Sequence, residues 1–269
     1  LSNSFSVAKS IVSLLTGIAL QEGKIKSLDE PVADFLAQFS SGLKSKITIR
    51  HLLTMSSGTN WDESYSSPLS PTTEAYYGND LMKTVCNVDV VKTPGTEWRY
   101  KSGDTELLGL VLEKATGKSL SNYASEKLWK PIGASQKALW STDKKDGNEK
   151  AYCCFNTNGR DFARIGQLYL DSGKWNGNQI VNSAYVNKSI QAVHIKDEEG
   201  NDCNYYGYLW WLLPERPGVF YARGILGQYI IDVPEKDVVI VRLGKNRGHV
   251  QHQSYQEVYD MVDWVLKNF

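Results

Sequence analysis

Apolar residues are concentrated in one stretch near the start of the chain and leave almost no polar face there. Residues 6–22 carry them at Val7, Ala8, Ile11, Val12, Leu14, Leu15, Ile18, Ala19 and Leu20. Because these positions cover most faces of a helix, the pattern predicts a central, buried helix rather than a surface one. Gly23 follows as a helix-ending residue.

The middle of the chain shows helical patterns separated by polar segments. Residues 47–58 predict a short extended piece and then a helix that Gly58 stops, while residues 104–117 and 160–170 predict two amphipathic helices. Residues 59–80 are rich in Ser, Pro and Tyr and predict a long loop. Long loops in compact domains are often functional, so this one is a candidate part of a site.

The pattern changes near residue 205 from helical to short β-type runs. Four runs are rich in β-branched and aromatic residues, namely "YGYLWWLL", "GVFYARG", "GQYIIDV" and "DVVIVRLG". The closing stretch, "SYQEVYDMVDWVLKNF", predicts an amphipathic helix. We therefore expect an α/β (α+β) protein with an antiparallel sheet flanked by helices. The first and last helices are expected to cover the faces of the sheet.

Composition and charge argue against nucleic acid as a partner and against a membrane-spanning segment. The chain has 269 residues, enough for one large domain or two interleaved ones. Lys+Arg and Asp+Glu both total 30, so the basic excess usual in nucleic-acid-binding proteins is absent. No apolar run reaches the ~18 residues of a membrane span. The sequence predicts no oligomeric state.

Cysteine and histidine show no metal-binding pattern. The four cysteines are too few for a disulfide scaffold, and the adjacent pair is not a C-x-x-C motif; they are Cys86, Cys153, Cys154 and Cys203. We expect them to be buried free thiols. The four histidines form no ligand cluster either, so neither a metal nor a cofactor is expected.

Ser6 and Lys9 open the buried helix, three residues apart. Residues at this spacing share one helix face, with Cβ atoms ~5–6 Å apart. Unpaired N–H groups at a helix start favour an oxyanion, and burial favours a neutral lysine, which suits a general base beside a nucleophilic serine. The S-x-x-K spacing also occurs in two polar segments, so it is weak alone. Alternatively, Ser4 or Ser6 merely caps the helix and Lys9 is solvated.

Two later stretches carry further candidates. Tyr100 and Ser102 form Y-x-S just before a helix, where a phenol and a hydroxyl would complete a proton relay. Gly224 and Gly227 lie at a strand start, where glycine permits close approach by a ligand. An edge strand there would donate a backbone N–H to an oxyanion, with the Ser6 N–H as second donor. The alternatives are a packed tyrosine and ordinary turn glycines.

In this order, "SFSVAKS", "WRYKSGDTELLG" and "ARGILGQYIIDVPEKD" resemble the serine β-lactamase and penicillin-binding family. The resemblance is strongest to its esterase and 6-aminohexanoate-dimer hydrolase branch, which "ITIRHLLTMSSGTNWDE" and "GRDFARIGQLYLDSGKWNG" also resemble. It implies a β-lactamase/transpeptidase-like fold. Residues 1–22 would form the nucleophile helix and residues 23–204 a mostly helical subdomain. Residues 205–269 would form the sheet and last helix.

The resemblance also implies roles for individual residues. Ser6 would be the acylated nucleophile, Lys9 its base, and Tyr100 the proton shuttle to the leaving group. The oxyanion hole would be the backbone N–H groups of Ser6 and Ile225. The expected substrate contacts are Tyr65, Ser102 and Gly224. We therefore expect a covalent acyl-enzyme hydrolase of small esters or amides.

Two departures from the family pattern qualify this expectation. Ala222 and Arg223 stand where the family has the lysine and threonine of K-T-G, which argues against efficient penicillin hydrolysis. The family also has a helix and strands ahead of the nucleophile, where this chain has five residues. The alternatives are a β-lactamase or penicillin-binding DD-peptidase, and a non-catalytic binding or sensor module of the same fold. Family members are mostly exported, which implies a periplasmic or other extracytoplasmic location, although no signal peptide is recognisable.

Overall fold

The computed structural model describes residues 1–269, which form nine α-helices and eleven short strands. The helices are α1 (Val7–Gln21), α2 (Ile49–Leu53), α3 (Pro71–Tyr77), α4 (Leu81–Cys86), α5 (Ser102–Thr116), α6 (Leu120–Ala124), α7 (Gly159–Leu170), α8 (Ser183–Ser189) and α9 (Gln256–Asn268). The strands are β1 (Ser2–Asn3), β2 (Leu139–Trp140), β3 (Phe155–Thr157), β4 (Lys174–Trp175), β5 (Asn178–Gln179), β6 (Trp211–Leu212), β7 (Phe220–Gly224), β8 (Gln228–Val233), β9 (Val238–Leu243), β10 (Val250–Gln251) and β11 (Ser254–Tyr255).

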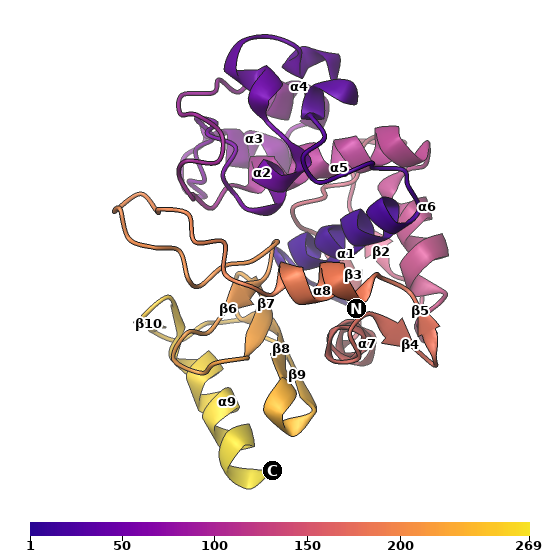
Figure 1. The fold of residues 1–269 in the computed structure, drawn as a ribbon, viewed down its shortest axis with the longest axis vertical. Helices are drawn as coiled ribbons and strands as arrows, with labels where there is room; N and C mark the ends of the chain where they lie inside the picture. The colour runs from indigo at the N-terminus through magenta and orange to yellow at the C-terminus, as the bar shows by residue number, and fades with distance from the viewer.

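The main sheet has four antiparallel strands in chain order, β6-β7-β8-β9. This confirms the sheet that the four β-type runs predict. Figure 1 shows α2, α3 and α4 grouped at one end of the molecule and the sheet with α9 at the other, with α1 between them. The small sheet β1-β3-β2 ties the start of the chain to residues 155–157 and was not expected from the sequence.

Helix α1 lies in the middle of the hydrophobic core, as its pattern predicts. Every residue from Val7 to Ala19 is buried. The helix contacts α5 and α8 as well as β7 and β8. Because it is enclosed on all sides, the first turn of α1 is a rigid platform for any chemistry carried by Ser6 and Lys9.

The faces of the sheet are covered differently from the prediction. Helix α9 covers one face, where Tyr229 Oη donates to Glu257 at 2.9 Å. Helix α7, rather than α1, provides most of the opposite cover, because Gly166 lies directly against Ile230, Asp232 and Val239. The sequence pattern marked α7 as amphipathic but did not reveal its partner.

Two predictions about the 47–80 region are also wrong in detail. Helix α2 ends at Leu53 rather than near Gly58, since the chain turns at Met55, whose φ is +53°. The predicted loop contains helix α3, which Ser70 caps by accepting from the Thr73 N–H and which Pro71 begins. Serine before proline is a favourable helix start, which the composition of the segment concealed.

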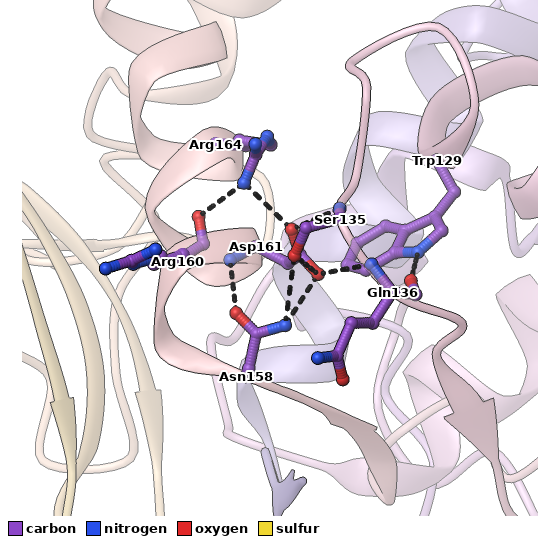
Figure 2. Close-up of polar contacts among 7 residues, drawn as sticks. All are labelled: Trp129, Ser135, Gln136, Asn158, Arg160, Asp161 and Arg164. Carbon is purple, nitrogen blue, oxygen red and sulfur yellow. Dashed lines mark hydrogen bonds and ion pairs between the residues drawn. The ribbon is translucent and has the colours of Figure 1, made fainter.

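Asp161 holds the start of α7 to the preceding loop. Its buried carboxylate accepts hydrogen bonds from Ser135 N and Oγ, Gln136 N, Asn158 Nδ2 and Arg164 at 2.7–3.2 Å (Figure 2). Burial alone would raise the pKa of Asp161, but the hydrogen bonds from Ser135 and Asn158 outweigh it and lower the pKa. The "GRDFAR" stretch therefore stabilises the fold, and none of its residues lines a cavity that Ser6 lines.

Strand β9 forms the open edge of the main sheet. Its residues Val238–Arg242 are half-buried, and a groove between them and α9 contains Met261, Trp264 and Phe269. An apolar strand edge of this kind is a general liability for self-association. None of the helices has both the length and the apolar character that crossing a bilayer requires.

Candidate active site

Ser6 and Lys9 meet at the first turn of α1. Lys9 Nζ lies 3.1 Å from Ser6 Oγ, 3.1 Å from Ser102 Oγ and 2.8 Å from the Tyr152 carbonyl oxygen. The lysine is 1 % exposed, and no carboxylate lies within ion-pair distance of its nitrogen. Lys9 is therefore not solvated, and Ser6 makes no side-chain capping hydrogen bond. Ser6 stands at the N-cap position of α1 but does not cap it through its side chain, and the alternative is wrong in placing Lys9 in solvent.

The turn before Ser6 is held in an uncommon conformation. Phe5 has a φ of +45°, which is unfavourable for a non-glycine residue, and its N–H donates to Asn3 Oδ1 at 2.8 Å. Gly224 packs against this turn, since a Cβ there would lie 2.2 Å from the Ser4 carbonyl oxygen. The predicted close approach at Gly224 therefore exists, but the approaching group is the chain itself.

Two backbone N–H groups near Ser6 Oγ have no acceptor. The N–H groups of Ser6 and Ile225 donate to no group of the protein, and both residues line the same two cavities. Strand β7 is not an edge strand, but β6 pairs only with Phe220 and Tyr221, so its Gly224 end is open on that side. The predicted pair of oxyanion donors is thus brought together.

Tyr100 lies beside Lys9 without reaching Ser6. Its ring centroid is 5.1 Å from Lys9 Nζ, and its side chain lines one of the cavities that Ser6 lines. The Tyr100 hydroxyl makes no hydrogen bond within the protein, so the predicted shuttle is placed at the site but is not connected in this conformation.

Glu63 connects the other predicted residues and was missed from the sequence. Its carboxylate accepts from Ser102 N, Ser102 Oγ and Tyr65 Oη, each at 2.6 Å, and from Trp61 Nε1 at 2.9 Å. Loss of water around the Tyr65 hydroxyl raises the Tyr65 pKa, and Tyr100 and Glu63 add to this effect. Nothing but its place in "WDESY" distinguishes Glu63 from the other acidic residues of the sequence.

Ser6 lines two cavities. One, of about 290 Å³, is mainly apolar and is lined by Phe5, Tyr76, Tyr77, Ile225 and Leu226. The other, of about 200 Å³, is lined by charged and polar groups that include Glu63, Tyr100, Arg223, Arg247 and Tyr255. Tyr65 lines both cavities. An ester or amide placed across Ser6 would therefore have an apolar and a polar end.

Of the two arginines that line the polar cavity, one has a hydrogen-bond partner in the protein and the other has none. The Arg223 guanidinium stacks on Trp211, 3.3 Å from the ring centroid, and donates to the Gln253 carbonyl at 3.1 Å. Arg247 has no hydrogen-bond or ion-pair partner and rests beside Tyr255, 5.0 Å from its ring. Trp211 therefore supports Arg223 and does not line either cavity.

Two of the cysteines are not free thiols, contrary to the prediction. Cys153 and Cys154 form a disulfide, whereas Cys86 and Cys203 are free and buried. Cys153 lines the apolar cavity and follows Tyr152, whose carbonyl accepts from Lys9. Residue spacing gave no signal for a bond between neighbouring cysteines, because disulfide frameworks are recognised from separated pairs. No group of His, Cys, Asp or Glu side chains is arranged to hold a metal ion.

The sequence matches a known family and a known hydrolase. The family model described as "Beta-lactamase" matches residues 1–255. A 6-aminohexanoate-dimer hydrolase from Paenarthrobacter ureafaciens is 26% identical over 256 residues, which cover 88% of this chain and 64% of that protein. The chain therefore spans less than two thirds of the length of this relative.

Solved structures agree in fold. A Bacillus anthracis protein described as a candidate 6-aminohexanoate-dimer hydrolase superposes with a TM-score of 0.82 at 24% identity, covering 97% of this chain and 70% of the other. A family VIII carboxylesterase superposes with a TM-score of 0.74 at 17% identity, covering 99% and 83%. At these identities the structures establish the fold alone: helices around an antiparallel sheet, in the β-lactamase/transpeptidase-like arrangement.

Proposed function

The chain belongs to the beta-lactamase family, and on that premise we propose that it is a serine hydrolase that cleaves small esters or amides through an acyl-enzyme on Ser6. The observation that carries the proposal is the surroundings of Lys9. A buried lysine without a carboxylate partner, 3.1 Å from a serine hydroxyl, is the arrangement that a lysine general base requires.

In the acylation step, the neutral Lys9 amine takes the proton of Ser6 Oγ as this oxygen attacks the substrate carbonyl. The oxyanion that forms accepts hydrogen bonds from the free N–H groups of Ser6 and Ile225. Lys9 then returns the proton by way of the Tyr100 hydroxyl to the leaving oxygen or nitrogen, and the C–O or C–N bond breaks. This transfer requires a movement of Tyr100 toward Ser6 when substrate binds.

In the deacylation step, a water molecule enters from the side vacated by the leaving group. Tyr100 and Lys9 accept its proton as its oxygen attacks the Ser6 ester. The oxyanion is again held by the two N–H groups, and collapse of the tetrahedral intermediate returns the proton to Ser6 Oγ. The enzyme ends in its starting protonation state, so the cycle needs no cofactor.

The cavities suggest how the substrate is oriented. Tyr100 lines only the polar cavity, so the leaving group would depart there, and the acyl group would occupy the apolar cavity of about 290 Å³. Tyr65, Ser102 and Gly224 would border the bound substrate. Arg247, which has no partner in the protein, favours a leaving group with a negatively charged end.

The β-lactamase or DD-peptidase alternative has one observation in its favour. Arg223 and Arg247 supply positive charge to the polar cavity, which suits the carboxylate of a β-lactam or a peptide. Against it stands the absence of the K-T-G lysine and threonine on β7. We propose the ester or amide activity first because acyl transfer needs a base beside Ser6 and donors for the oxyanion. Lys9 and the N–H groups of Ser6 and Ile225 would supply both without a K-T-G motif.

The proposal is tested by hydrolysis of 4-nitrophenyl esters. We expect a stoichiometric burst of nitrophenol followed by turnover, faster with butyrate than with acetate because the acyl cavity is apolar, and neither phase with Ser6→Ala. Faster turnover of a chromogenic cephalosporin than of any ester would favour the β-lactamase alternative. A burst without turnover would favour the binding or sensor module, and no reaction by folded protein would refute the hydrolase.

We also propose an extracytoplasmic location. The Cys153–Cys154 disulfide supports it, because disulfides persist mainly in oxidising compartments.

A further inference from the structure

Glu63 lies at the centre of a hydrogen-bonded chain that ends at Lys9. Its Oε2 accepts from two N–H donors, Trp61 Nε1 at 2.9 Å and Ser102 N at 2.6 Å. Its Oε1 accepts from two hydroxyls, Ser102 Oγ and Tyr65 Oη, both at 2.6 Å. A carboxylate can only accept, so all four donors must point at Glu63.

This arrangement fixes the hydroxyl proton of Ser102. Since that proton is donated to Glu63, Ser102 Oγ can only accept a hydrogen bond from Lys9 Nζ, 3.1 Å away. The Tyr152 carbonyl, 2.8 Å from Nζ, can likewise only accept. Nζ also lies 3.1 Å from Ser6 Oγ, a third group to which a charged lysine donates. In the neutral lysine that the proposed function requires, a lone pair replaces one N–H bond. Since Ser102 Oγ and the Tyr152 carbonyl can only accept, that lone pair would face Ser6 Oγ.

We propose that Glu63 is a positioning residue for acyl transfer: it keeps Ser102 an acceptor and thereby reserves the Lys9 lone pair for the Ser6 proton. This inference rests on the proposed hydrolase function. Glu63 does not touch the reacting atoms in this role, and it acts through Ser102 alone. Its bond to Tyr65 has a separate consequence, which is to fix a side chain that lines both cavities.

The Glu63→Gln substitution would reverse one hydrogen bond. Trp61 Nε1 and Ser102 N are fixed donors, so the oxygen of the introduced amide must face them. The amide nitrogen would then face Ser102 Oγ and donate to it. The Ser102 proton would turn toward Lys9 and occupy the lone pair that Ser6 needs. The variant changes the direction of a hydrogen bond while side-chain size is conserved.

The test measures the rate of Ser6 phosphonylation by a fluorophosphonate between pH 5 and 10, and kcat and KM for 4-nitrophenyl butyrate. Glu63→Gln should lower the phosphonylation rate and kcat by about 10²-fold, with KM within about threefold of wild type. Glu74→Gln, an exposed change on α3, is the matched control and should behave as wild type.

Two further variants distinguish an effect of hydrogen-bond direction at Ser102 from an effect of side-chain packing around residue 63. Ser102→Ala in the Glu63→Gln background removes the misdirected proton and should recover about tenfold of the lost rate. Glu63→Asp keeps an acceptor-only group and should remain within about tenfold of wild type, which also covers failure of the glutamine variant to fold.

Three outcomes would overturn the inference: a Glu63→Gln rate within about twofold of wild type, no recovery in the double variant, or Glu63→Asp as slow as Glu63→Gln. If the wild type is not labelled at all, the proposed function fails instead. The two failures are therefore distinguishable.

Discussion

Asp161, in the first turn of α7, and Asp232, which packs against α7, are both fully buried, yet their surroundings are opposite. Asp161, at the start of the helix, accepts hydrogen bonds from backbone and side-chain donors, and its pKa is lowered (Figure 2). Asp232, on β8 against Gly166, has no hydrogen-bond partner for either oxygen, and burial raises its pKa well above the usual value. Burial therefore raises the pKa of an aspartate unless hydrogen-bond donors offset it, as they do at Asp161.

The active site follows the Asp161 pattern. Lys9, Ser102 and Glu63 are each supplied with partners, and their donors and acceptors can be matched one to one. Where a partner is missing, as at the Tyr100 hydroxyl, the group lines a cavity that solvent or substrate can fill. Substitution of Lys9 or Asp161, which have partners, is therefore expected to lower activity or stability. Substitution of Asp232, which has none, is expected to raise stability.

The largest effect is expected at Lys9. Lys9→Met keeps the apolar stem but removes the base, so the rate of Ser6 acylation should fall by about 10³-fold. The measurement is the burst rate with 4-nitrophenyl acetate. Lys144→Met is the matched control, since Ser141 and Lys144 have the same spacing in an exposed segment, and it should leave the rate unchanged. An active Lys9→Met variant would mean that another group is the base.

The next effect is a loss of stability at Asp161. Asp161→Ala would leave the Ser135 and Gln136 N–H groups and the Arg164 guanidinium without their acceptor, and should lower the free energy of unfolding by about 3 kcal/mol. Urea unfolding at pH 7 measures this. A loss below about 1 kcal/mol would show that water replaces the carboxylate effectively.

Asp232 should respond in the opposite direction. Asp232→Val removes an unpartnered carboxyl from a strand position that suits a β-branched residue, and should raise the free energy of unfolding by about 1–3 kcal/mol at pH 7. Activity should not change, because Asp232 lines neither of the cavities that Ser6 lines. Destabilisation by this variant would indicate a partner, such as a buried water, that satisfies the carboxyl.

The pH dependence of the free energy of unfolding supplies a control for the predictions at both aspartates. The pKa of Asp232 is raised, so its contribution favours folding below the ordinary value of 3.8 and is lost as pH rises toward the folded-state value. The stabilisation by Asp232→Val should therefore grow between pH 3 and 7. The pKa of Asp161 is lowered, so the destabilisation by Asp161→Ala should shrink as pH falls below 3.8. Parallel pH curves for the two variants would contradict the contrast.

The smallest effect concerns the cysteines. Without reductant, denatured protein should take up two equivalents of iodoacetamide, at Cys86 and Cys203, and after reduction it should take up four. Intact mass measures the difference. Four equivalents without reduction would restore the free-thiol prediction.

Much of the fold was predictable because local patterns agree with it. The helix at 6–22 and the closing helix were recognised from their apolar pattern, and the four β-type runs from their β-branched and aromatic residues. Both helices and the strands β7, β8 and β9 are found close to the predicted bounds, whereas the run at 206–213 forms only the two-residue strand β6. The cover of the sheet by α7 was not predictable, since an amphipathic pattern shows that a face is buried but not against what. Helix α3 was concealed by Ser and Pro, which mark a helix start as readily as a loop.

The site was only partly predictable for a similar reason. The residue types of Ser6, Lys9 and Tyr100 carry recognisable chemistry at recognisable spacings. Glu63 does not, since its importance arises from contacts with Ser102, 39 residues away. Likewise, the Gly224 position is explained by the Ser4 carbonyl, a contact between residues far apart in the sequence.

The most direct test of the account is intact mass after incubation with a fluorophosphonate probe. The account predicts a single adduct on the wild-type protein, none on Ser6→Ala, and a strongly slowed adduct on Lys9→Met. An adduct that persists on Ser6→Ala, or its absence from well-folded wild-type protein, would contradict the claim that Ser6 is an activated nucleophile.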